Sequence, residues 1–506
     1  MSEGPLTREE LHPVITVEVG PMAHGGHCVA RHEGRVVFVR HAIPGETVQV
    51  ALTEREPTAR YWRGEVVHVV HASDYRRRHI WKLADSVRAH QAGRLPVGGA
   101  EFGHITDQHQ RRLKAHVFRD TLQRIGGISV GELPAHAHHA DGEIHVEDVS
   151  AAHSNGLHWR TRVGFAVTPT GALAMKPFRS NDLIELRGMP LAVEAIHESR
   201  IFTADFRGAH RVDVVAPGGK DPLTLLVHVE EAPAQDPGGD GQAGGWEGLR
   251  RRLSALSAED PRIGSILLAR HYAENAAPRR SSRPSKRRGR QSGGASSRPA
   301  PTEPAESVSY DVVVGERSIV ESLPEAGGVA ESVRLPPESF WQIHRNAPTA
   351  LVRSVREVTT LSTGDDAADL YAGAGLFTGW AAATVGPGGR VLSIEAAAPS
   401  SRSAADAFGA AEQVEVLTSP VERALAAVRG SRVVVLDPPR TGAGARVVDG
   451  LDRAGAEEII YVSCEPSSFA RDAKDLMSRG FKVSDLRVLD LYPNTHHMES
   501  VARFTR

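Results

Sequence analysis

A glycine-rich turn follows a short apolar run in the C-terminal third of the chain: Asp369-Leu370-Tyr371-Ala372-Gly373-Ala374-Gly375. Glycines in such a loop let the backbone approach a ligand at the carboxyl end of a strand. Glu395 ends the next apolar run, where a carboxylate can accept both hydroxyls of an adenosine ribose. Gly373, Gly375 and Glu395 are therefore predicted to bind a cofactor that contains adenosine.

Two cofactor classes fit this pattern, the nicotinamide dinucleotides and S-adenosylmethionine. The loop lacks the third glycine of the dinucleotide fingerprint, and it lies late in the chain. Both features favour S-adenosylmethionine.

Outward from the loop, apolar runs alternate with helical segments. The runs end at Tyr371, Glu395, Leu417, Pro439 and Cys464. Strands that are apolar throughout and separated by helices are typical of a parallel sheet with both faces covered. Residues 335–506 are predicted to form an α/β Rossmann-like domain, closed by strands over 481–490 and 501–504.

The N-terminal region has a different pattern. Short β-branched runs, separated by Gly- and Pro-containing turns, cover residues 14–19, 35–39, 47–52 and 64–70. About sixty residues of short strands avoid bare edges by closing on themselves, so residues 10–74 are predicted to form a small β-barrel. The simpler alternative is a β subdomain that binds no ligand.

Residues 75–334 mix a helical segment at 108–126 with alternating stretches, which predicts a central α+β domain. Within it, residues 276–306 are rich in Arg, Ser, Gly and Pro and should form a disordered insertion. The insertion is either an arm that binds phosphates or a solvated loop with incidental charge. Four histidines between residues 136 and 145 lack the helical spacing of a metallopeptidase site, and no metal site is predicted.

Composition excludes several classes of protein. The 506 residues include 60 basic and 62 acidic side chains, so the formal charge of -2 creates no global field for nucleic acid. Apolar runs are too short to span a membrane, and the N-terminus lacks the pattern of a signal peptide, which predicts a cytoplasmic protein. Two cysteines, Cys28 and Cys464, cannot build a disulfide framework or a four-cysteine cluster.

Two motifs at strand ends carry candidate chemistry. Asp437-Pro438-Pro439-Arg440 follows the fourth apolar run, and its prolines hold the Asp437 carboxylate where α/β sheets bind ligands. Ser463-Cys464-Glu465-Pro466 follows the fifth, and Pro466 suits the first position of a helix. A helix N-terminus favours a thiolate at Cys464, whereas Glu465 opposes it. A buried structural cysteine is the alternative.

These motifs together resemble the RNA uracil carbon-5 methyltransferase family. The resemblance is carried by Phe340-Trp341-Gln342, residues 369–375, Asp437–Arg440, Ser463–Pro466 with Arg471-Asp472, and Thr495-x-His497-x-Glu499. The N-terminal run from Gly20 to Arg31 resembles a TRAM domain, an OB-like RNA-binding barrel. Many TRAM-bearing members carry a four-cysteine iron–sulfur motif after the barrel, but residues 76–103 contain no cysteine, so no cluster is expected.

The resemblance implies a role for each motif residue. It makes Cys464 the nucleophile and Glu499 the general base. Further residues are assigned to the cofactor and the target base: Gln342, Tyr371, Gly373, Gly375, Glu395 and Asp437 for S-adenosylmethionine, and Asp437, Arg440 and His497 for the substrate.

The chemistry explains why a cysteine and a carboxylate are needed. Carbon 5 of uracil is too weak a nucleophile to attack a methyl sulfonium, but adding a thiolate to carbon 6 turns the ring into a reactive enolate. The TRAM-like module favours ribosomal RNA over transfer RNA, and a monomeric enzyme is expected. Two other functions fit the sequence, RNA cytosine carbon-5 methylation and RNA binding by a catalytically inert protein.

Overall fold

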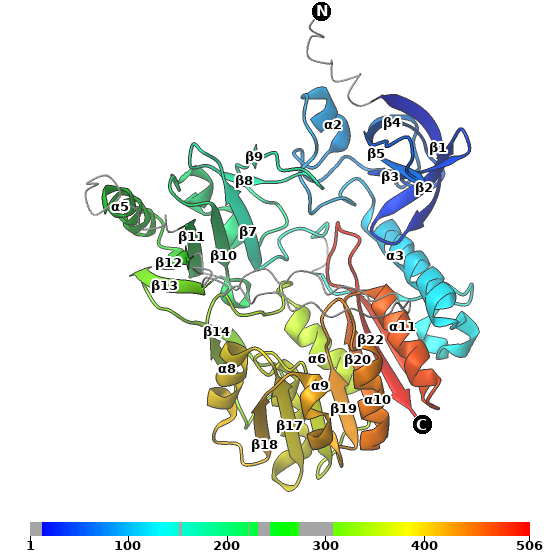
Figure 1. Cartoon of the computed structure of the whole chain (residues 1–506), viewed down its shortest axis with the longest axis vertical. Coiled ribbons are helices and arrows are strands. Elements are labelled where there is room, and N and C mark those ends of the chain that lie inside the picture. The colour runs from blue at the N-terminus through cyan, green and yellow to red at the C-terminus, as the bar shows by residue number, and fades with distance from the viewer. Residues whose placement is uncertain (1–12, 151–153, 221, 231–242, 273–306) are drawn as a thin grey trace, which may run out of the picture.

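The computed structural model describes residues 13–150, 154–220, 222–230, 243–272 and 307–506. These residues form an N-terminal barrel, a central sheet and a larger C-terminal sheet (Figure 1). Within these ranges, no helix has both the length and the apolar character needed to cross a membrane. The predicted basic insertion at 276–306 lies outside the described residues.

The barrel is closed, with strand order β1-β2-β3-β5-β4. Its strands are β1 (Val14–Ala23), β2 (His27–His32), β3 (Arg35–Arg40), β4 (Thr47–Glu54) and β5 (Tyr61–His71). Val37, Val48 and Val50 are fully buried in its core, because alternate side chains of each strand point inward. The predicted OB-like barrel is confirmed. The strand prediction omits β2, which follows the His24-Gly25-Gly26 turn.

The central sheet has seven strands in the order β13-β12-β11-β10-β7-β8-β9. Their bounds are β7 (Arg162–Val167), β8 (Leu173–Met175), β9 (Ile184–Glu185), β10 (Arg211–Val215), β11 (Leu223–Glu230), β12 (Ile263–Tyr272) and β13 (Ser307–Val314). Helix α5 (Ala243–Glu259) packs on β12 and β13. The short helix α4 (Glu194–His197) packs in the core of this region. Helix α2 (Ser86–Gln91) contacts β5 of the barrel, and the hairpin of β14 (Ile319–Ser322) and β15 (Ser332–Leu335) packs on the C-terminal region.

The C-terminal sheet has eight strands in the order β18-β17-β16-β19-β20-β22-β21-β6. Its strands are β6 (Val146–Asp148), β16 (Asp366–Leu370), β17 (Arg390–Glu395), β18 (Val414–Thr418), β19 (Val433–Leu436), β20 (Glu458–Ser463), β21 (Lys482–Asp490) and β22 (Glu499–Thr505). Strands β16 to β20 are parallel, and β22 is antiparallel to both of its neighbours. This is the predicted Rossmann-like arrangement.

Helices cover both faces of this sheet. Val434 and Leu436 of β19 pack with one group, whereas Val433 and Val435 pack with the other, because successive side chains point to opposite faces. The first group includes α10 (Gly444–Ala454) and α11 (Pro466–Met477), and the second includes α6 (Ala347–Val358), α7 (Leu376–Val385) and α8 (Ala398–Phe408). The short helix α9 (Val421–Ala424) lies on the first face.

Part of the middle of the chain packs on the C-terminal sheet. The predicted helix at 108–126 forms α3 (Asp107–Thr121) and a π-helical turn, Leu122–Gly126. Phe118 of α3 stacks on Phe469 of α11, with ring centroids 5.9 Å apart. The buried Lys114 ammonium lies 2.6 Å from Asp490 at the end of β21. Strand β6 extends the sheet beyond β21.

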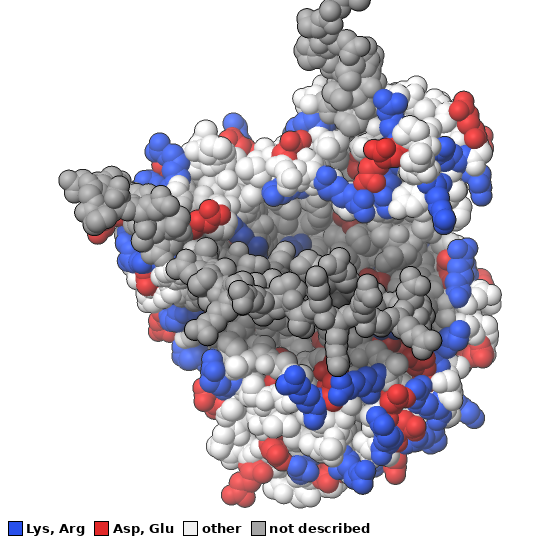
Figure 2. All heavy atoms as spheres, in the orientation of Figure 1, with Lys and Arg blue, Asp and Glu red and all other residues white. Residues whose placement is uncertain are grey.

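Charged side chains of both signs are mixed over the face in Figure 2. Lys and Arg lie on the barrel and on the C-terminal region, with acidic groups between them. This mixture agrees with the near-zero net charge. Recognition of a charged ligand by such a surface depends on local groups more than on a global field.

Candidate active site

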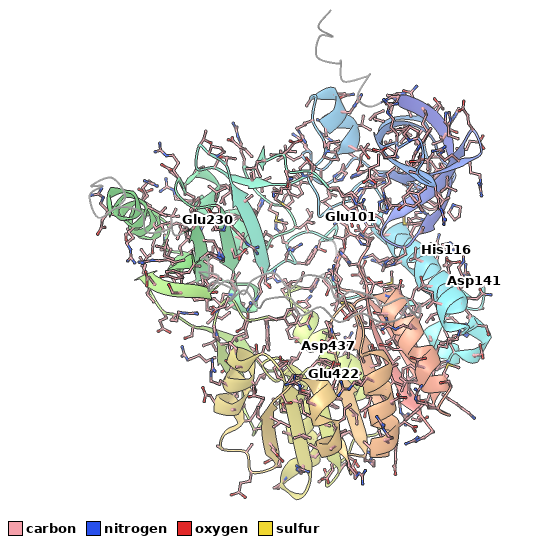
Figure 3. All side chains as sticks on the ribbon, in the orientation of Figure 1. Glu101, His116, Asp141, Glu230, Glu422 and Asp437 are labelled. Atoms are coloured by element: carbon pink, nitrogen blue, oxygen red, sulfur yellow. The ribbon has the colours of Figure 1, made fainter. Side chains whose placement is uncertain are left out.

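The strand order reverses at β16, which lies between β17 and β19. Ligands of open α/β sheets bind at such a point, beyond the carboxyl ends of the strands. A cavity of about 690 Å³ opens there, within the roughly 300–1,000 Å³ typical of cofactor sites. Asp437 lies at the edge of the sheet that faces the barrel and the central sheet (Figure 3).

Nine of the ten predicted site residues line this one cavity. They are Gln342, Tyr371, Gly373, Glu395, Asp437, Arg440, Cys464, His497 and Glu499. They come from segments that are far apart in the chain, and the sheet brings the segments together. Gly375 is the predicted residue that does not line the cavity.

Gly373 fits a cradle for a cofactor. Its φ of +57° lies in the left-handed region that favours glycine, and an added Cβ would meet no atom within 4 Å. Its N–H donates to Oε2 of Glu395 at 2.8 Å, and Oε1 of Glu395 accepts from the N–H of Ala397 at 2.5 Å. Backbone bonds thus fix the Glu395 carboxylate beside an open stretch of glycine backbone, an arrangement that fits an adenosine ribose.

Gly375 has a packing role. At its φ of +93°, an added Cβ would lie 2.4 Å from the Phe408 ring. The residue caps the start of α7, so its small size lets that helix pack against α8. Asp369 is also structural, since its buried carboxyl accepts a hydrogen bond of 2.7 Å from Thr378. Burial raises the pKa of Asp369 to about 7.

Asp437 and Glu499 form an acidic pair in the cavity. Burial raises the pKa of Asp437 to about 7. Burial and then the charge of Asp437 raise the pKa of Glu499 well above its usual value, against the opposing effects of the Tyr492 hydrogen bond and Arg440. The Tyr492 hydroxyl donates to Oε2 of Glu499 at 3.2 Å, and Oε1 has no partner among the described residues. A carboxyl with a raised pKa is suited to proton transfer near neutral pH.

Cys464 lies half-buried between β20 and α11. Burial raises its pKa to about 12, and the charges of Glu499, Asp437 and Glu465 contribute, whereas Arg440 lowers it. These effects outweigh the thiolate stabilisation expected from a helix N-terminus. The helix is capped by Glu465, whose side chain accepts from the N–H of Ser467 at 3.2 Å. The neutral thiol is therefore favoured, and Arg440 is the neighbouring charge that opposes this effect.

The loop between β21 and β22 is held by Asn494, which the sequence patterns do not single out. Its side-chain oxygen accepts from Arg77 at 2.8 Å and Gln110 at 3.0 Å. Its Nδ2 donates to the carbonyl of Gly156 at 2.8 Å. Asn494 has a φ of +64°, and its polar side chain is the signal that marks it as a turn residue. Three distant segments thus fix the loop that carries His497 and precedes Glu499.

His497 is uncharged at neutral pH. Burial and the neighbouring His496 lower its pKa to about 3. His496 in turn pairs with the buried Glu101, whose carboxylate also accepts the backbone N–H of His496 at 3.0 Å. A neutral imidazole in the cavity can donate or accept a hydrogen bond with a planar base.

Sequence comparisons match the chain at both ends. The profile of the family described as tRNA (Uracil-5-)-methyltransferase matches residues 306–506, and that of the TRAM domain matches residues 11–67. A protein of Streptomyces avermitilis described as an uncharacterized RNA methyltransferase is 32% identical, and the alignment covers 96% of each chain. A 23S rRNA (uracil(1939)-C(5))-methyltransferase of Acinetobacter baumannii is 24% identical, over 100% of this chain and 99% of that protein.

A solved structure has the same fold along almost the whole chain. It is the tRNA (uracil-54, C5)-methyltransferase of Pyrococcus abyssi, in complex with S-adenosyl-L-homocysteine. The TM-score is 0.61 at 18% identity, over 97% of this chain and 100% of that one. Family profiles match the barrel and the C-terminal domain, and a relative aligns over nearly the full length of the chain. The chain therefore belongs to the TRAM-bearing branch of the RNA uracil carbon-5 methyltransferase family.

Proposed function

We propose that this protein methylates carbon 5 of a uracil in ribosomal RNA, with S-adenosylmethionine as methyl donor and Cys464 as covalent nucleophile. The observation that carries the proposal is the single cavity that joins the glycine loop, Cys464 and Glu499. One chain supplies all of these groups, which supports a monomeric enzyme. The full-length likeness to a protein named for 23S rRNA supports the ribosomal target and, with it, a cytoplasmic location.

The cofactor end of the cavity is formed by Gly373, Glu395 and Gln342. When bound there, S-adenosylmethionine supplies an electrophilic methyl group. Glu395 would accept hydrogen bonds from the ribose hydroxyls, and the bare backbone at Gly373 would leave room for the rest of the molecule. Tyr371, with its φ of +60°, turns the chain into this loop.

The substrate end holds Cys464, Arg440 and the acidic pair. A uracil within an RNA stem has to leave the stack to enter this cavity. The Cys464 thiol loses its proton to the Asp437 carboxylate, aided by the positive charge of Arg440, which leaves Glu499 ionised for the later step, and the thiolate adds to carbon 6 of uracil. The electrons of the carbon 5–carbon 6 double bond move into the ring to give an enolate, and Asp437 aligns the base edge.

The second half of the reaction requires a base. After carbon 5 has gained a methyl group, it still carries its hydrogen. Glu499 removes this proton, the double bond re-forms, and the Cys464 thiolate leaves carbon 6. The bond from Tyr492 to Oε2 keeps Glu499 in place while Oε1 remains free to take the proton.

The direct test incubates the purified protein with cofactor labelled in its methyl group and with separate unmodified ribosomal and transfer RNAs. The expected result is label in ribosomal RNA, found as 5-methyluridine after digestion to nucleosides. If only transfer RNA were labelled, the substrate would be transfer RNA and not ribosomal RNA. If the labelled nucleoside were 5-methylcytidine, the target base would be cytosine and not uracil. Saturable cofactor binding without methylation of either RNA would indicate an inert RNA-binding protein.

A further inference from the structure

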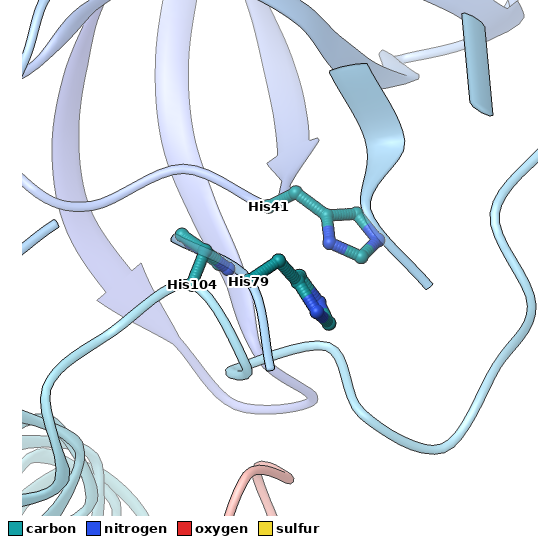
Figure 4. Close-up of side chains that lie close together, drawn as sticks. All are labelled: His41, His79 and His104. Carbon is teal, nitrogen blue, oxygen red and sulfur yellow. The ribbon is translucent and has the colours of Figure 1, made fainter. Parts of the chain in front are cut away.

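Three buried histidines meet where the barrel joins the segment that follows it. His41 comes after β3, His79 lies in the segment after β5, and His104 precedes α3. One ring nitrogen of each lies within 4.8 Å of the other two. Figure 4 shows the rings around a common centre, with one nitrogen of His41 facing the other rings and the other pointing away. No sequence pattern predicts this cluster, because its members are far apart in the chain.

Most ring nitrogens of the cluster have no hydrogen bond of good geometry to the described residues. Both nitrogens of His41, both of His104 and Nε2 of His79 have no hydrogen bond among the described residues. The residues are only 4%, 4% and 7% exposed. Buried polar groups are normally hydrogen-bonded, so several ring nitrogens without a well-aligned partner in one small space point to a ligand.

The backbone conformation and packing around the cluster position these rings. His41 has a φ of +61°, a strained conformation for a residue with a side chain. Gly103 lies flat against His79, where an added Cβ would be 2.5 Å from the ring. The N–H of Arg77 donates to the carbonyl of His104 at 2.8 Å, which joins the two segments that carry His79 and His104.

We propose that His41, His79 and His104 bind one Zn²⁺ ion. Zinc bonds to histidine nitrogen at about 2.0–2.1 Å, so two ligand nitrogens on a tetrahedral ion lie about 3.3 Å apart. The ring nitrogens of the three histidines lie within 4.8 Å of one another, so modest rotations of the rings would bring them to the distances that zinc requires. Neutral nitrogen ligands in a site with no thiolate suit zinc better than magnesium or calcium, which prefer oxygen.

Neighbouring groups complete the site. Nε2 of His41 lies 3.3 Å from the buried Glu65 carboxylate, which can orient this ring when the metal is on Nδ1. The N–H of Trp81 donates to Nδ1 of His79 at 3.0 Å, so the free nitrogen of that ring is Nε2. With zinc on Nε2 the ring proton would lie on Nδ1, so the ring would have to turn away from the Trp81 N–H.

The ion would brace the segment that holds the active-site loop. Glu101 binds His496, and the N–H of Phe102 donates to the carbonyl of Asn494 at 2.9 Å. Both residues lie directly before His104. Residues 72–106 contain little regular structure apart from α2, so a metal cross-link to the barrel would stabilise them.

The test uses the full chain without a histidine tag. The protein is stripped with EDTA, incubated with excess ZnCl₂, passed through a desalting column and analysed for zinc and iron by mass spectrometry. The expected result is close to one equivalent of zinc and a higher Tm than that of the stripped protein. His79→Ala and His104→Ala should each lose the bound zinc and the zinc-dependent rise in Tm.

Two control variants separate this site from the other histidines. His228→Ala removes a buried histidine that is bonded to Asp213 in the central sheet, and His139→Ala removes an exposed one. Both should keep the bound zinc. If the cluster variants do not fold, Co²⁺ binding to the stripped wild-type chain should give the visible absorption of a tetrahedral nitrogen site, which ZnCl₂ removes. A wild-type chain that retains no metal and gives no such absorption, or cluster variants that retain zinc, would overturn the proposal.

Discussion

The hydroxyl of Tyr492 donates a hydrogen bond of 3.2 Å to the carboxylate of Glu499 across the loop that joins the last two strands. The bond connects the two ends of that loop, and it reaches the one oxygen of Glu499 that has a partner among the described residues. It also lowers the pKa of Glu499, against the larger effect of burial. Tyr492 is therefore positioned to tune the proposed base as well as to hold it.

Removing this hydroxyl should change the pH profile. In Tyr492→Phe the carboxylate loses a hydrogen bond that stabilises its charged form, so the pKa of Glu499 rises further. A base with a higher pKa is ionised only at higher pH, and the acidic limb of kcat should move upward. Tyr75→Phe, which changes a tyrosine stacked on His109, is the control and should keep the wild-type profile.

Cys464 and Glu499 should give opposite phenotypes, because in the proposed mechanism they act before and after the methyl transfer. Cys464→Ala should abolish turnover and adduct formation but keep cofactor binding. Glu499→Gln retains the thiol, so addition and methylation proceed, but the proton on carbon 5 stays and elimination stalls. This variant should accumulate a methylated protein–RNA adduct that survives denaturing electrophoresis.

The position of the adduct is checked by mass spectrometry of the digested protein. The wild-type chain should form the same adduct with RNA that contains 5-fluorouracil, since fluorine cannot leave as a proton. Normal turnover by Cys464→Ala, or an adduct on Cys28, would contradict the mechanism.

Arg440 should control the reactivity of the thiol. Its charge lowers the pKa of Cys464, which burial and the carboxylates raise to about 12. In Arg440→Met the pKa rises further, so less thiolate exists at any given pH and alkylation by iodoacetamide slows. Cys28 is fully buried, and burial raises its pKa, so alkylation of the native protein reports on Cys464. Arg446→Met in α10 is the control, and its Cys464 should be alkylated at the wild-type rate.

Alanine substitutions at the two glycines of the loop should affect cofactor binding and protein stability to different extents. Both have positive φ, +57° at Gly373 and +93° at Gly375, so an alanine is strained at either position. At Gly375 the new methyl also meets Phe408, which should cost about 1–3 kcal/mol more and lower the Tm further. At Gly373 it meets no protein atom but enters the cofactor space, so cofactor affinity should fall about tenfold, or 1.4 kcal/mol. Calorimetry with S-adenosylhomocysteine and thermal unfolding measure the two effects, and equal losses of Tm would contradict this assignment.

The basic insertion is tested by deletion of residues 276–306. If its arginines contact phosphates, the deletion weakens RNA binding and flattens its salt dependence, because each neutralised phosphate adds about 0.7–0.9 to the log–log slope. Binding measured at several salt concentrations checks this. Unchanged affinity and slope would identify the segment as a solvated loop.

The sequence by itself determined the features that depend on near neighbours in the chain. Apolar runs separated by helices predict the parallel sheet, because a strand buried on both faces needs apolar side chains on both. The glycine loop and Glu395 point to a cofactor site, because parallel strands end at the same edge of the sheet. Cys464 and Glu499 are recognised through motifs, and the cavity that contains both agrees with that interpretation.

Tertiary structure alone decided what joins distant segments. Nothing local in the sequence indicates that Arg77, Gln110 and Gly156 meet at Asn494, or that β6 extends the C-terminal sheet. The same holds for the cluster of His41, His79 and His104, and for the carboxylates that raise the pKa of Cys464. Periodicity and turn residues encode short-range structure, whereas such contacts, and the pKa shifts that follow from burial, exist only after the chain has packed.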